Sequence, residues 1–136
     1  MTRAVLDPNV LVAAAINPHG APASCLRAHG EGRFELVVSP LLLAELIGVL
    51  SRPRFRPFLT VEQAERLVEA LRHDAMLVDD PTEREAVSRD PNDDYLVALA
   101  RAVSAHVLVT GDRDLLVLDL ADLRIVSPRA FIEALP

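Results

Sequence analysis

The chain has 136 residues, of which 51% are apolar and spread along its whole length, so we expect one compact core and a single domain over residues 1–136. A single cysteine and the absence of lysine exclude an intramolecular disulfide, a thiolate-rich metal site, Schiff-base chemistry and a P-loop. The net charge of −6 argues against nucleic-acid binding by bulk electrostatics, unless clustered acids bind divalent cations and invert the local field.

The first half of the chain alternates short apolar strands with helices. Strands are predicted over residues 3–6 and 35–38, and helices over residues 10–16, 21–29 and 40–50. The first strand ends at Asp7, because the proline that follows ends ladder pairing and Asp favours a turn. Ser39 and Pro40 are typical of a helix start, a hydroxyl N-cap followed by proline in the first turn. Two closely spaced prolines predict an irregular loop over residues 52–57.

The second half of the chain continues this alternation. Helices are predicted over residues 60–72, 93–102 and 128–135 and strands over residues 75–78, 106–109 and 123–126, while the acidic stretch 79–93 has room for a short helix. Thr60 and Gln63 have the spacing of a capping box. The alternation predicts an α/β fold with a mostly parallel, twisted sheet of four or five strands and helices on both faces. In such sheets, ligands bind beyond the carboxyl ends of the strands, where the strand order reverses.

Glu45 is the only charged residue in the apolar stretch 41–50. A helix that is apolar on nearly every face is expected to be buried, and a buried carboxylate costs several kcal/mol, on the order of the cost of burying an ion, unless it is paired or binds metal. Two other interpretations remain open: an ion pair with an arginine, or an exposed position on a helix that is less buried than its composition implies.

Three further segments carry acids that each have an ordinary structural explanation. Asp7 is a candidate turn residue or N-cap, Asp94 lies at a helix start where the macrodipole favours an acid, and Asp112 or Asp114 could cap the helix that follows. Asp7 and Asp112 both follow predicted strands, so they are expected at the same edge of the sheet. Carboxylates without Cys or His suit Mg²⁺ or Mn²⁺, and two such ions about 4 Å apart can promote phosphodiester hydrolysis.

Four segments carry a family resemblance: VLDPNVL (residues 5–11), SPLLLAEL (39–46), DPNDDYLVALA (90–100) and LVTGDRDLL (108–116). With these motifs in this order, essentially the whole chain resembles the PIN-domain ribonucleases, in particular the prokaryotic, VapC-like toxins of toxin–antitoxin pairs. The resemblance implies a metal-dependent endoribonuclease that uses Mg²⁺ or Mn²⁺, forms a homodimer and is inhibited by a small antitoxin protein.

The resemblance also assigns roles to individual residues. It implies that metal binding and catalysis belong to four acids, with a fifth as an accessory metal ligand: Asp7, Glu45, Asp94, Asp112 and Asp114. Asn9 and Thr110 match the polar residues that support the acids at the two strand ends. The residue types of the 52–57 loop, and not the resemblance, suggest candidate RNA contacts: Arg52, Arg54 and Arg56, together with Phe55 and Phe58. The alternative is that this loop is simply solvated.

Pro8 departs from the family pattern, which usually has Thr or Ser after the first Asp. The proline deletes a hydroxyl and a backbone N–H beside the expected metal site. It therefore supports an alternative, a catalytically inactive PIN-like module that binds RNA or a protein partner. A receiver-type signalling domain is disfavoured by the absence of lysine, and a dehalogenase-type phosphatase by Asn at position 9.

The sequence carries no membrane signal. Its apolar runs fall far short of the ~20 residues that span a bilayer. The N-terminus lacks the cationic and apolar stretches of a signal peptide. We therefore expect a soluble, cytoplasmic protein without membrane contacts.

Overall fold

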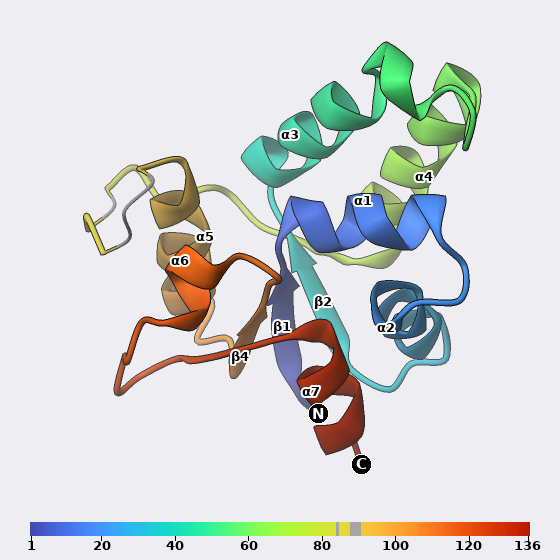
Figure 1. Ribbon diagram of the computed structural model, residues 1–136. Helices are drawn as coiled ribbons and strands as arrows, with labels where there is room; N and C mark the ends of the chain where they lie inside the picture. The colour runs from blue at the N-terminus through green and yellow to red at the C-terminus, as the bar shows by residue number, and fades with distance from the viewer. Residues whose placement is uncertain (84, 88–90) are drawn as a thin grey trace.

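The centre of the molecule is a five-stranded sheet in the order β3-β2-β1-β4-β5, with every neighbouring pair parallel (Figure 1). The computed structural model describes residues 1–83, 85–87 and 91–136. The strands are β1 (Arg3–Leu6), β2 (Glu35–Val38), β3 (Met76–Leu77), β4 (Val107–Val109) and β5 (Arg124–Val126). The predicted α/β fold is confirmed, and the sheet is parallel throughout rather than mostly parallel.

Helices cover both faces of this sheet. They are α1 (Pro8–Ile16), α2 (Ala21–Gly30), α3 (Pro40–Leu50), α4 (Val61–Asp74), α5 (Pro91–Ala102), α6 (Arg113–Leu116) and α7 (Pro128–Ala134), with a 3-10 turn, η1 (Pro53–Phe55). On one side α1 contacts α2 and α3, while α2 contacts α7 and α3 contacts α4. On the other side α5 packs on β1 and β4, and α6 contacts β5.

The starts of α3 and α4 form as the sequence predicts, because short polar side chains satisfy the first backbone N–H groups, whereas α1 and α5 each begin two residues before the predicted start. The hydroxyl of Ser39 accepts from Leu42 N at 3.3 Å. Thr60 and Gln63 form the predicted capping box of α4, with both reciprocal hydrogen bonds present. Local sequence therefore fixes where α3 and α4 begin.

Residues 52–57 differ from the predicted irregular loop. Pro53 begins the 3-10 turn η1, where a missing N–H is tolerated because the first N–H groups of a helix have no partner within it. Phe55, at the end of η1, is buried. The short helix predicted within residues 79–93 is not found in the described residues 79–83 and 85–87; residues 84 and 88–90 lie outside the described part of the chain.

The strand order reverses between β1 and β4. From β1 the chain moves outward through β2 and β3, then returns to the other side of β1 with β4 and β5. Both central strands are buried, with Val5, Leu6 and Leu108 each 0% exposed. Their carboxyl ends diverge into connections that run in opposite directions, which is the usual place for a ligand site in a parallel sheet. No helix in the described part of the chain combines the length and apolar composition needed to cross a membrane.

Candidate active site

Asp7 lies at the carboxyl end of β1 and is only 2% exposed. It is the N-cap of α1, and its Oδ1 accepts from the backbone N–H of Asn9 at 2.9 Å. The side chain of Asn9 itself is exposed, so its observed support for Asp7 comes from the backbone. Pro8 is the first residue of α1, where a helix has no use for an N–H, so the departure from the family pattern leaves this cap intact.

Thr110 links the end of β4 to the end of β1. It is fully buried, and its hydroxyl donates to Asp7 Oδ2 at 2.8 Å and accepts from Asp112 N at 3.0 Å. A backbone hydrogen bond also links the two strand ends, since Asp7 N donates to Val109 O at 2.9 Å. One hydroxyl therefore positions the Asp7 carboxylate and the turn that carries Asp112.

Asp112 is the N-cap of the short helix α6. Its Oδ1 accepts from Asp114 N at 2.9 Å, and both acids are partly buried. The capping role considered for Asp112 is therefore present, and Asp114 lies in the first turn of the same helix. Capping occupies one oxygen of the Asp112 carboxylate and does not by itself exclude a second role for this acid.

The pKa of Asp7 reflects its burial beside a second acid. Burial raises the pKa of Asp7 above its ordinary value, the hydrogen bonds from Asn9 and Thr110 lower it, and the negative charge of Asp112 raises it again. The net direction is upward, so the fold keeps a carboxylate where its ionised form is disfavoured. A cation between Asp7 and Asp112 would relieve that penalty.

Glu45 is exposed, and the expectation that it is buried is wrong. α3 buries one side, formed by Leu42, Leu43, Leu46 and Leu50. Its other side is exposed although mostly apolar, and comprises Leu41, Ala44, Glu45 and Gly48. Composition could not separate these two faces, because apolar residues occupy both. The exposed position, one of the open interpretations, is therefore observed.

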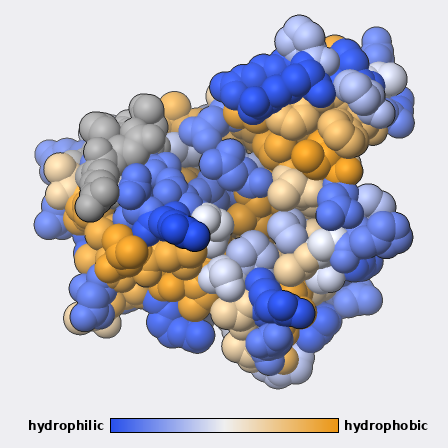
Figure 2. All heavy atoms as spheres, viewed as in Figure 1, coloured by the Kyte–Doolittle hydropathy of each residue, from blue (hydrophilic) through white to orange (hydrophobic). Residues whose placement is uncertain are grey.

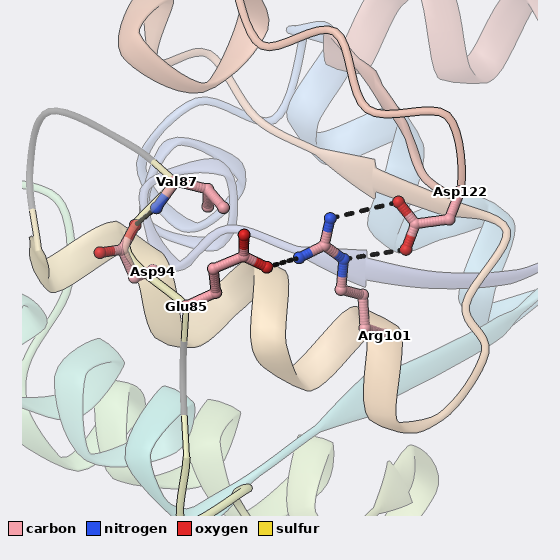
Figure 3. Close-up of polar contacts among 5 residues, drawn as sticks. All are labelled: Glu85, Val87, Asp94, Arg101 and Asp122. Atoms are coloured by element: carbon pink, nitrogen blue, oxygen red, sulfur yellow. Dashed lines mark hydrogen bonds and ion pairs between the residues drawn. The ribbon is translucent and has the colours of Figure 1, made fainter.

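Tyr95 and Asp94 bring α5 to the same edge. The hydroxyl of Tyr95 donates to Glu45 Oε1 at 3.3 Å, although the two residues are 50 positions apart. Burial raises the pKa of Tyr95 above its ordinary value, and the charges of Glu45, Asp7 and Asp80 raise it further. Asp94 is 4% exposed, and its Oδ1 accepts from Val87 N at 3.2 Å (Figure 3). Tyr95 thus lies among acids from three separate segments.

Tyr95 and Asp80 were missed at the sequence level. Tyr95 is the only tyrosine of the chain and follows Asp94 in an otherwise apolar run, which is the signal that could have identified it. Asp80 follows β3, and its Oδ2 accepts from Leu41 N at 2.9 Å, in the first turn of α3. An acid at this end of a helix is favoured by the macrodipole. Asp80 therefore fixes the start of α3 against the segment that follows β3.

Arg101 fixes the segment that reaches Asp94. Its guanidinium binds Asp122 at 2.8 Å and Glu85 at 3.1 Å, joining α5 to residues on either side of it in sequence (Figure 3). Glu85 is two residues from Val87, whose N–H donates to Asp94. The guanidinium also lowers the pKa of Asp122 below its ordinary value, mainly through the hydrogen bond. These contacts place Val87 over the start of α5.

The acids meet at one edge but do not form a closed group. Asp7, Thr110 and Asp112 form one hydrogen-bonded set, here called the strand-end half. Glu45, Asp94 and Tyr95 come from α3 and α5 and are called the helix half. Within residues 1–83, 85–87 and 91–136, no three His, Cys, Asp or Glu side chains are arranged to hold a metal ion. Their oxygens are nevertheless the donor type that Mg²⁺ and Mn²⁺ prefer.

The arginine-rich turn after α3 divides into two kinds of residue. Arg56 donates to the carbonyls of Leu50 and Arg52, at the carboxyl end of α3. Arg52 and Arg54 are exposed, and the Arg54 guanidinium lies 4.8 Å from the centre of the Phe55 ring. The idea that Phe55 stacks on RNA bases is wrong, because its ring is buried. Phe58 is 58% exposed and is open to such a contact.

Figure 2 shows the polarity of the face that contains this edge. Hydrophilic surface occupies the middle of the view, between α5 and α3, and apolar surface lies below it around α6. In this view the surface between α5 and α3 is therefore more polar than the surface around α6.

Comparisons with known proteins identify the fold and the family. The sequence matches the family model described as PIN domain over residues 3–114, which include Asp7, Glu45, Asp94, Asp112 and Asp114. It is 27% identical over 140 residues to an uncharacterised protein of Methanocaldococcus jannaschii, covering 96% of this chain and 90% of that protein.

Two solved structures have a similar fold. The structure of VapBC2 from Rickettsia felis, bound to a DNA fragment of its promoter, aligns with a TM-score of 0.63 at 20% identity, over 91% of this chain and 97% of that one. PAE2754 from Pyrobaculum aerophilum aligns with a TM-score of 0.62 at 17% identity, over 98% of this chain and 88% of that one. Since the family model matches most of its length, the chain belongs to the PIN-domain family, whose members are generally nucleases.

Proposed function

We propose that the chain is a divalent-metal-dependent endoribonuclease that hydrolyses RNA phosphodiester bonds. The observation that carries the proposal is the buried Asp7 carboxylate, which Thr110 positions beside Asp112 at the carboxyl ends of β1 and β4. A strand end that keeps two acids close, at the cost of a raised Asp7 pKa, is more than a helix cap requires. The proposed catalytic and metal-binding acids are Asp7, Glu45, Asp94 and Asp112, with Asp114 as an accessory ligand.

The two halves of the site contribute carboxylates from different elements in this proposal. Asp7 and Asp112 offer carboxylate oxygens whose positions the strand ends fix, while Glu45 and Asp94 approach from α3 and α5. Bound Mg²⁺ or Mn²⁺ supplies an activated water and neutralises charge on the scissile phosphate. The net charge of −6 does not oppose this, because the acids at the site are the ones that the cation neutralises.

We propose two further contacts for the substrate and a protein partner. The exposed Arg52 and Arg54 bind RNA phosphates, whereas Arg56 serves mainly to bind the end of α3. Because one structural neighbour is a VapBC2 assembly, we propose that this chain is a toxin paired with a small antitoxin protein, and that it acts as a homodimer in the cytoplasm.

The alternative is a PIN domain that binds RNA or a protein without cutting RNA. Pro8 is the observation that favours it, because it replaces a hydroxyl-bearing residue beside Asp7. Pro8 nevertheless leaves the Asn9 N–H on Asp7, so the alternative requires that the missing hydroxyl, and not a misplaced carboxylate, abolishes cleavage.

A cleavage assay tests the proposal. The purified chain is incubated with a broad panel of RNAs in EDTA and then in Mg²⁺ or Mn²⁺, and cleavage is expected only with metal. Four single substitutions should each remove most of the activity: Asp7→Asn, Glu45→Gln, Asp94→Asn and Asp112→Asn. The exposed Asp79→Asn is the matched control, since it removes an acid outside both halves and should keep full activity.

Two results would contradict the proposal in different ways. Cleavage that persists in EDTA would exclude the metal-dependent mechanism. Wild-type protein that binds Mn²⁺ yet cuts no RNA in the panel would favour the inactive-module alternative.

A further inference from the structure

The contact between Tyr95 and Glu45 joins a fixed side chain to an exposed one. Tyr95 is 6% exposed on α5, so its ring has little freedom, whereas Glu45 is exposed on α3. The hydroxyl donates to Glu45 Oε1 at 3.3 Å. An exposed glutamate samples several rotamers in water, and a hydrogen bond from a buried donor restricts that sampling.

We propose that Tyr95 is a positioning residue, whose hydroxyl orients the Glu45 carboxylate toward Asp94 and Asp7 and thereby sets the metal affinity of the site. This inference rests on the proposed function, because it assigns the orientation of one of the proposed metal ligands. The ring belongs to the residue directly after Asp94, so one short piece of α5 carries an acid and also positions a second acid from α3.

The backbone that carries Glu45 is also fixed. Asp80 accepts from Leu41 N at 2.9 Å, and Leu41 lies one helical turn before Glu45. Asp80 therefore helps to fix the α3 backbone, and Tyr95 binds the Glu45 side chain from α5. The charges of Asp7 and Asp80 also raise the pKa of Tyr95, so its hydroxyl lies near acids besides Glu45.

The first experiment measures Mn²⁺ affinity calorimetrically for wild type and Tyr95→Phe. This substitution removes the hydroxyl and keeps the ring that fills the core. Partners that orient a metal ligand typically contribute tenfold or more, so the dissociation constant should rise on the order of tenfold. The control is Thr60→Ala, which removes the N-cap of α4; it should lower the melting temperature and leave Mn²⁺ affinity unchanged.

A double-mutant cycle separates orientation from a general effect on the fold. If Tyr95 acts through Glu45, Tyr95→Phe should change Mn²⁺ affinity in the wild-type background and have no further effect in Glu45→Gln. A loss of the same size in both backgrounds would overturn the proposal, as would a wild-type affinity in Tyr95→Phe. Wild-type protein that binds no Mn²⁺ would instead overturn the proposed function, and this inference with it.

The chain offers a spectroscopic signature that does not depend on Tyr95→Phe folding. Tyr95 is the only tyrosine and there is no tryptophan, so the near-ultraviolet absorption and emission of tyrosine come from this residue alone. Replacing Glu45 with Gln substitutes a neutral acceptor for a charged one, and should shift the tyrosine absorption band of the metal-free protein. Thr60→Ala should not shift it. A spectrum that is the same in wild type and Glu45→Gln would overturn the contact on which the proposal stands.

Discussion

The strand-end half and the helix half present the same chemical groups in opposite physical settings. Asp7 is buried and receives hydrogen bonds on both oxygens, from Asn9 N and from the Thr110 hydroxyl. Glu45 is exposed and receives a hydrogen bond from Tyr95 across the gap between two helices. The side chains of the strand-end half are therefore positioned when the sheet forms, whereas those of the helix half depend on how α3 and α5 pack. Substitutions in the two halves should therefore have different consequences.

The largest expected difference is in stability. Thr110→Val keeps the shape of a fully buried side chain but removes the donor to Asp7 and the acceptor for Asp112 N. Leaving the buried Asp7 carboxylate and the partly buried Asp112 N without the hydroxyl should lower the free energy of unfolding by about 2 kcal/mol, the typical cost of an unsatisfied buried group. Tyr95→Phe should cost less than about 1 kcal/mol, because water can reach the exposed Glu45 carboxylate.

Urea denaturation in EDTA at neutral pH measures both free energies. Thr60→Ala provides a scale, since loss of an N-cap typically costs about 1 kcal/mol. Equal losses in Thr110→Val and Tyr95→Phe would show that the two halves do not differ in rigidity as described.

The next difference is in pH dependence. In the folded protein the pKa of Asp7 is raised above the ordinary value of 3.8, mainly by burial, so the folded state binds its proton more tightly than the unfolded state does. Below the unfolded pKa both states are protonated and Asp7 carries no ionisation penalty. As the pH rises from 3.8 through the folded pKa, the folded state must ionise a buried acid, and stability is lost.

The substitution Asp7→Asn removes this titration. In EDTA, the stability of Asp7→Asn relative to wild type should therefore increase as the pH rises from 3.8 through the folded pKa of Asp7, by the linkage between proton binding and unfolding. Denaturation midpoints at several pH values measure the trend. Asp79→Asn, at an exposed position, should follow wild type throughout. If the difference in stability between Asp7→Asn and wild type stays constant with pH, the pKa of Asp7 is not raised in the folded protein, and this prediction is wrong.

The smallest effect concerns the turn that continues the helix half beyond α3. In an Asp7→Asn background, which prevents cleavage, Arg52→Ala with Arg54→Ala should weaken RNA binding and reduce the slope of log affinity against log salt by about 1.4, from about 0.7 for each contact. Arg56→Ala is the matched control. It should lower stability, because Arg56 binds the carbonyls of Leu50 and Arg52, and leave the salt slope unchanged. Unchanged RNA binding in the double variant would show that these arginines lie in a solvated turn and do not contact RNA.

The sequence by itself determined the frame of the site. Strand and helix alternation predicted a parallel sheet, and the positions of Asp7 and Asp112 after strands placed them at one edge. Caps such as Ser39 and Thr60 fixed helix starts because their partners lie within three residues. Short-range patterns of this kind are readable because both partners stand in the same few residues of chain.

Tertiary structure alone decided which face of α3 meets solvent, and hence that Glu45 is exposed. It also decided the partners that orient the acids: Thr110 lies 103 residues from Asp7, and Tyr95 lies 50 residues from Glu45. The burial of Phe55 was decided in the same way. The physical reason is that the composition and spacing of a segment report its local conformational preferences. The burial and hydrogen bonding of a residue depend instead on which distant segment packs against it.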